Sequence, residues 1–109
     1  QDEFERLAKE APEELLEWIS SGELSNPDLS FAAEACGIIF GHDELVIKTL
    51  LLILKNEMPV VREGVICGLS PFLYNKFVQE ALNKLIIDDP STGVREAARE
   101  AAREAALCD

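Results

Sequence analysis

The chain has 109 residues, of which 48% are hydrophobic and 28% charged, and its formal net charge at pH 7 is −11. This length and apolar content predict one globular domain and exclude a disordered chain or a collagen-like fibre. The excess of acids repels phosphate groups, so we expect neither nucleic acid nor an anionic membrane as a partner. With only 6% aromatic residues, six Gly and five Pro, the composition favours an all-α fold.

The negative charge is concentrated at the start of the chain, where residues 1–28 hold nine acids and two bases. The longest apolar run, from Leu45 to Leu54, includes Lys48 and Thr49 and is about half as long as a membrane-spanning helix. The first residues are acidic, whereas a secretory signal begins with basic ones. These features predict a cytoplasmic protein that does not enter a membrane.

Three helices are predicted in the first part of the chain. Apolar residues at helical spacing predict a helix over about 2–10. Pro12 at a first helical position and Gly22 just beyond the last turn bound a second helix, over about 12–21. A polar loop then leads to a third helix, over about 28–40.

Four more helices follow at short intervals. Asp43 is expected to cap a helix over about 44–56, and Pro59 to open the next one, over about 59–72. The last two helices are predicted over about 74–88 and 91–107.

An internal repeat relates these later helices. The pair Val61-Arg62 recurs as Val94-Arg95 at a spacing of 33, and Leu50 recurs as Leu82 at a spacing of 32. A single helix pair cannot bury its apolar side alone, so successive pairs must stack, which predicts a right-handed α-solenoid of antiparallel helix pairs. Ankyrin and tetratricopeptide repeats have similar periods, but their signature residues are absent.

Two stretches of the chain resemble the short HEAT-like repeat family, in the variety also found in phycobilisome-lyase-type proteins. They run from Asp43 to Arg62 and from Asp89 to Ala98, and the Val-Arg pair after a turn is their most specific part. The run from Ala32 to Gly37 resembles the end of a first helix of that family. The resemblance covers about 28–106, and it implies a single solenoid domain with a helical cap over 1–27, repeats over 28–59 and 60–90, and a terminal half repeat over 91–109.

Such repeats serve as scaffolds, adaptors and a few enzymes alike, so the resemblance marks the fold only. We expect a non-enzymatic module that binds a protein or peptide, because an apolar stripe with lysines at its rim suits such a partner. In this family the second helix of each pair lines the concave face, which here corresponds to 44–56 and 74–88. The residues expected to contact a partner are Leu45, Lys48, Thr49, Leu52, Lys55, Asn56, Glu80 and Lys84.

Two other functions remain open. A chromophore-lyase-like subunit would hold a partner protein and a tetrapyrrole, and copurifying pigment would reveal it. An acidic mimic would occupy a basic, nucleic-acid-binding protein, and the charge of residues 1–28 is the argument for it.

No catalytic, metal or cofactor site is predicted. His42 is the only histidine, and its sequence neighbours do not supply the partners of a metal site or a nucleophile. The three cysteines form no Cys-x-x-Cys pair and are expected to be reduced. We expect Cys36 and Cys67 to be buried and Cys108 to be exposed.

Three Arg-Glu-Ala-Ala tetrads follow one another from Arg95 to Ala106. Glu96 with Arg99, and likewise Glu100 with Arg103, would pair on the solvent side. The opposite side is almost all alanine, so this helix is predicted to be either a weak end cap or the contact of a homo-oligomer.

Overall fold

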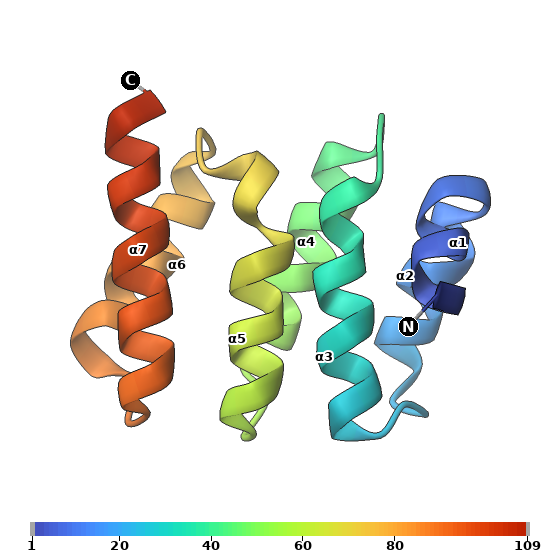
Figure 1. The fold of residues 1–109 in the computed structure, drawn as a ribbon, viewed down its shortest axis with the longest axis horizontal. Coiled ribbons are helices and arrows are strands. Elements are labelled where there is room, and N and C mark those ends of the chain that lie inside the picture. The colour runs from blue at the N-terminus through green and yellow to red at the C-terminus, as the bar shows by residue number, and fades with distance from the viewer. Residues whose placement is uncertain (1, 109) are drawn as a thin grey trace.

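The computed structural model describes residues 2–108, with the side chains of 3–106. Within this part the chain forms seven α-helices, two short 3₁₀ helices and no strand (Figure 1), which confirms the all-α prediction. The helices are α1 (Asp2–Glu10), α2 (Pro12–Ser21), α3 (Asn26–Ala35), α4 (Asp43–Ile53), α5 (Pro59–Gly68), α6 (Lys76–Asp88) and α7 (Thr92–Cys108), and the 3₁₀ helices are η1 (Cys36–Ile38) and η2 (Ser70–Phe72).

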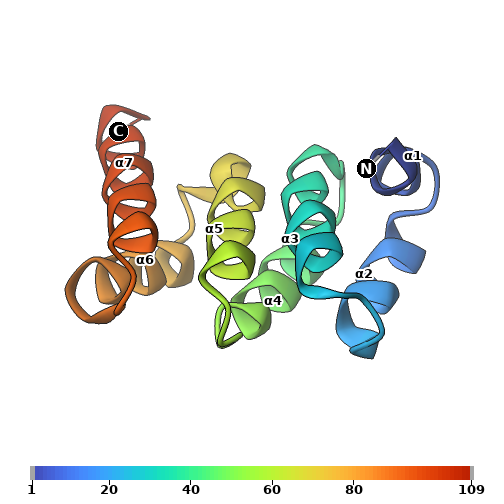
Figure 2. The ribbon, with the colours of Figure 1, turned by 60° about the horizontal axis from the view of Figure 1, so that its bottom comes forward.

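The helices lie in two layers. In one layer α1, α3, α5 and α7 lie side by side in chain order, and in the other α2, α4 and α6 do the same (Figure 2). Helices α3, α5 and α7 run in the same direction, from the bottom of Figure 1 to its top. The chain therefore advances by one helix of each layer per step, along a molecule of 33 × 29 × 20 Å.

The hydrophobic core is one continuous cluster between the two layers, to which all seven helices contribute. Its largest fully buried side chains are Leu15, Cys36, Val46, Leu50, Val61, Val65, Leu69, Val78, Leu82 and Val94. At the α1–α2 end, the rings of Phe4 and Trp18 pack at a centroid distance of 5.3 Å, and Trp18 is half-buried against the core.

Three helices end earlier than their apolar pattern predicts: α3 at Ala35, α4 at Ile53 and α5 at Gly68. The helix that begins at Pro59 ends at Gly68 and continues as the 3₁₀ helix η2. Pro71 is the cause, because it has no N–H to donate to the carbonyl of Cys67 and it disfavours helical backbone at the residue before it. The hydroxyl of Ser70 donates to that carbonyl instead, at 2.7 Å.

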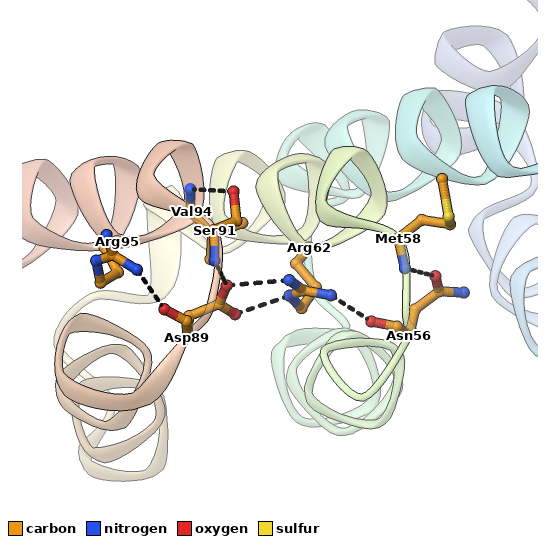
Figure 3. A network of polar contacts seen from close by, with 7 residues as sticks. All are labelled: Asn56, Met58, Arg62, Asp89, Ser91, Val94 and Arg95. Atoms are coloured by element: carbon orange, nitrogen blue, oxygen red, sulfur yellow. Dashed lines mark hydrogen bonds and ion pairs between the residues drawn. The ribbon is translucent and has the colours of Figure 1, made fainter.

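The turns before α5 and α7 have the same hydrogen bonds, one period of the sequence repeat apart (Figure 3). The side-chain oxygen of Asn56 accepts from the amide of Met58 at 2.8 Å, and that of Asp89 accepts from the amide of Ser91 at 2.9 Å. In each case the arginine six residues later, Arg62 or Arg95, donates to the backbone carbonyl oxygen of the same Asn56 or Asp89. The repeat seen in the sequence thus has a direct counterpart in local structure.

An ion pair joins consecutive units of this repeat. Nε and Nη2 of Arg62 donate to the two carboxylate oxygens of Asp89 at 2.8 and 3.0 Å, and both side chains are buried (Figure 3). The third guanidinium nitrogen of Arg62, Nη1, donates to the backbone carbonyl oxygen of Asn56 at 2.8 Å. Arg62 therefore connects the turn before α5 to the turn before α7.

The alanine side of α7 faces the rest of the same chain. Ala98 and Ala101 are buried, and Ala97 and Ala105 pack partly buried against the core. The exposed side carries the Arg and Glu residues, and the predicted pairs of Glu96 with Arg99 and of Glu100 with Arg103 do not form within 4.0 Å. A homo-oligomer through α7 stays a prediction. Ala98 and Ala101 of the alanine side proposed for it are covered within the chain, whereas Ala106 is exposed.

The two cysteines whose side chains are described differ in exposure. Cys36 is buried, as predicted, whereas Cys67 is exposed because it lies on the outer side of α5. The prediction for Cys67 was therefore wrong, and that for Cys108 falls outside the described side chains.

We expect iodoacetamide to alkylate Cys67 in the native protein and to leave Cys36 unmodified. Burial raises the pKa of the Cys36 thiol to about 12, so the reactive thiolate is both scarce and shielded. Partial burial and the carboxylates of Glu34 and Glu63 also raise the pKa of Cys67, so its labelling should accelerate well into alkaline pH. Peptide mapping after labelling at several pH values measures both rates. Equal native labelling of the two thiols would contradict this expectation.

Candidate functional site

A groove runs between α4 and α6 and consists of two adjoining hollows. One has a volume of about 620 Å³ and the other about 510 Å³. The first is lined by Glu44, Leu45, Ile47, Lys48, Leu51, Asn75 and Phe77, and the second by Leu51, Leu54, Lys55, Phe77, Glu80, Ala81, Lys84, Leu85, Asp88, Asp89 and Pro90. Because Leu51 and Phe77 line both, we treat the hollows as one feature, the α4–α6 groove.

Phe77 is the most prominent apolar side chain of this groove, with 68% of its surface exposed. It lies in the first turn of α6, which is fixed by Asn75: the side-chain oxygen of Asn75 accepts from the amides of Phe77 and Val78 at 2.9 and 3.2 Å. Its place among the other apolar side chains that line the groove makes this exposed ring a candidate contact for a partner.

Five of the eight residues predicted to contact a partner line the α4–α6 groove. They are Leu45, Lys48, Lys55, Glu80 and Lys84. Leu52 is 58% exposed, as expected for a residue opposite the core, but it lines neither hollow.

The other two predicted contact residues are occupied within the chain. Thr49 is only 6% exposed, because α4 packs against α2 on that side as well as against α5, so its predicted placement on the outer side was wrong. The side chain of Asn56 forms the turn before α5, where it accepts the amide of Met58. The apolar pattern of α4 alone could not show that α2 packs over the side of the helix that carries Thr49.

Sequence reasoning missed Phe77 as a candidate binding residue. The signal was available in the repeat. At the 32-residue spacing that relates Leu50 to Leu82, Phe77 corresponds to Leu45, which is also an exposed apolar residue. Applying this spacing to Leu45, already predicted to contact a partner, would have identified Phe77.

A second groove lies between α2 and α4 and has a volume of about 510 Å³. It is lined by Glu13, Glu14, Leu16, Glu17, Ser20, Leu45 and Thr49. We call it the α2–α4 groove. Leu45 lines both this groove and the α4–α6 groove, so the two are neighbours across α4.

The two grooves differ in charge. The chain has five lysines, and three of them, Lys48, Lys55 and Lys84, line the α4–α6 groove. None of these ammonium groups lies within 4.0 Å of a carboxylate among the described residues. The α2–α4 groove, by contrast, has three glutamates and no basic residue in its lining.

His42 and Asp43 serve the start of α4. His42 occupies the N-cap position without a side-chain capping bond, and Asp43 is the first helical residue, so the predicted cap by Asp43 was wrong. The Asp43 carboxylate accepts instead from the hydroxyl of Tyr74 at 2.9 Å, which raises the pKa of that phenol. No group of three or more potential metal ligands occurs in the described part of the chain.

Comparisons with protein-family models, with curated proteins and with solved structures give no match. Among the described residues, no helix combines the length and the apolar character needed to cross a bilayer.

Proposed function

We propose that this chain is a non-enzymatic, cytoplasmic interaction module, built as a right-handed α-solenoid of HEAT-like helix pairs. It binds a protein or peptide segment on the layer formed by α2, α4 and α6. The two-layer order of the helices and the turns that recur after one repeat period support this architecture.

The observation that carries the proposal is the α4–α6 groove with Phe77 exposed in it. Its floor is apolar and includes Leu51 and Leu54, while charged residues stand along its sides. An apolar centre with a polar rim is the usual composition of a protein-binding surface. The size of the hollows suits a few large side chains of a partner.

We expect Phe77→Ala to weaken partner binding at least tenfold, the loss typical of an aromatic hot spot. The helix start should persist, since Asn75 caps it and the Phe77 ring is largely in solvent. A random-peptide display library panned on the wild-type protein supplies the ligands, and fluorescence anisotropy measures their affinity for each variant.

Ile87→Ala is the matched control, because Ile87 is an exposed apolar residue of the same helix that lines neither groove. It should bind like the wild type. Leu52→Glu, on the same layer but outside the hollows, is expected to weaken binding less than Phe77→Ala while helicity is retained. Equal binding by the Phe77 and Ile87 variants would rule out the groove as the binding site.

A further inference from the structure

The two grooves of the α2, α4 and α6 layer form one surface that a single bound segment can cover. Leu45 lines both grooves and is 43% exposed, so the boundary between them is an accessible apolar side chain. Each groove also has an apolar floor, provided by Leu16 and Leu45 on one side of α4 and by Leu51 on the other. A segment that lies across α4 at Leu45 therefore contacts both.

The charges on this surface are distributed unevenly. Glu13, Glu14 and Glu17 are exposed, and none has a basic residue within 4.0 Å in the described part of the chain. Clustered carboxylates without a counterion attract cationic groups, and the net charge of −11 increases this attraction at long range.

The α4–α6 groove is close to neutral. Its lysines at 48, 55 and 84 are matched by the acids Glu44, Glu80 and Asp88, since Asp89 is already paired with Arg62. It therefore lacks the net negative charge of the α2–α4 groove and attracts cations less strongly. A basic segment is thus attracted to one side of α4, and an apolar segment to the other.

We infer that the partner is a protein segment in which a stretch of Lys or Arg adjoins large apolar side chains. It crosses α4 with its basic part over the α2–α4 groove and its apolar side chains in the α4–α6 groove. This inference rests on the proposed function and specifies the chemistry of the partner.

The test uses three synthetic peptides with the same apolar half, containing Leu and Phe at helical spacing. Their other half is rich in Lys and Arg, in Glu, or in Ser and Gln. Fluorescence anisotropy with the full chain, at low and at physiological ionic strength, gives the affinities. We expect the basic peptide to bind roughly tenfold or more tighter than the neutral one, and the acidic peptide to bind weakest.

Charge variants locate the basic half of the peptide. The triple variant Glu13→Gln, Glu14→Gln, Glu17→Gln should bind the basic peptide roughly tenfold more weakly and lose most of the salt dependence. The control Glu96→Gln, Glu100→Gln, Glu104→Gln changes the net charge equally, on exposed positions of α7, and should retain nearly full affinity. Phe77→Ala should weaken all three peptides by a similar factor.

The outcomes separate this inference from the proposed function. If the peptides bind through Phe77 but without a preference for the basic one, or if both triple variants weaken binding equally, the inferred partner chemistry is overturned and the groove remains a binding site. If none of the three peptides binds, the inference and the proposed function are both overturned.

Discussion

Arg62→Ala is expected to lower the free energy of unfolding by about 3–5 kcal/mol, the usual cost of removing one partner from a buried ion pair. The variant leaves the carboxylate of Asp89 buried with the amide of Ser91 as its remaining donor, and it also removes the bond to the carbonyl of Asn56. Urea unfolding followed by circular dichroism measures the change.

Arg95→Ala is the matched control for that substitution. Arg95 occupies the equivalent position in the next unit of the repeat and bonds the carbonyl oxygen of Asp89 and the hydroxyl of Thr92, but no carboxylate. We expect a loss of about 1 kcal/mol. Similar losses for both variants would show that the buried ion pair contributes no more than the bond to the turn.

The same ion pair predicts a pH dependence. Burial raises the pKa of Asp89, but hydrogen bonds from Arg62 and from the Ser91 amide outweigh it and hold the pKa below the ordinary value of 3.8. A carboxyl whose pKa is lowered on folding stabilises the protein above its unfolded-state pKa, and this stabilisation is lost as the pH falls through the folded-state value. Acidification below about pH 4 should therefore reduce the stability of the wild type more than that of Arg62→Ala.

Gly64→Ala is expected to destabilise the protein by about 1–3 kcal/mol, although alanine is the better helix former. A Cβ atom at position 64 would lie 2.5 Å from the carbonyl oxygen and 2.6 Å from the Oγ of Ser30, so α3 and α5 would have to separate. Gly68→Ala should act in the same way, because its Cβ would overlap the carbonyl of Ala33. Thermal unfolding measures both variants.

Gly93→Ala is the control for the two inner glycines. Its Cβ would come within 2.9 Å of a carboxylate oxygen of Glu63, the end of a flexible side chain that can move aside. We expect an unchanged or slightly higher melting temperature, from the helix propensity of alanine. A loss at Gly93 equal to that at Gly64 would mean that helix packing does not explain the effect.

Helix positions could be predicted well where residues with local signals mark the ends. Pro12, Pro59 and the left-handed Gly22 bound their helices as expected, since their effects depend on the backbone within a few residues. Asp43 was predicted as the cap and is instead the first helical residue, and its carboxylate accepts from Tyr74, which lies 31 residues away. A contact between residues so far apart leaves no local signal in the sequence.

The candidate site was only partly predictable. Lys48 and Lys84 could be placed on the outer side from the helical period, and both line the groove. The burial of Thr49 depends on how closely α2 approaches α4, which the pattern of a single helix does not contain. Phe77 required a comparison of corresponding positions in two units of the repeat.

The junction at Asn56 shows how the units are matched to each other. Arg62 pairs with Asp89 at the start of the next unit, whereas one period earlier the corresponding residues are the buried Leu29 and the uncharged Asn56. At Asn56, therefore, the arginine and the aspartate of the ion pair are both replaced by uncharged residues, and no buried carboxylate is left without a counterion.

The regular spacing of these turns makes the chain extendable in whole units. A tandem duplication of residues 57–89 would place Asp89 of the first copy directly before the second copy, in the position that Asn56 occupies now, and each copy of Arg62 would find its own aspartate. Inserting one residue instead would rotate the following helix by roughly 100° and turn its apolar side away from the core. Homologous chains should therefore differ in length by whole repeat units, with longer ones carrying a proportionally longer groove.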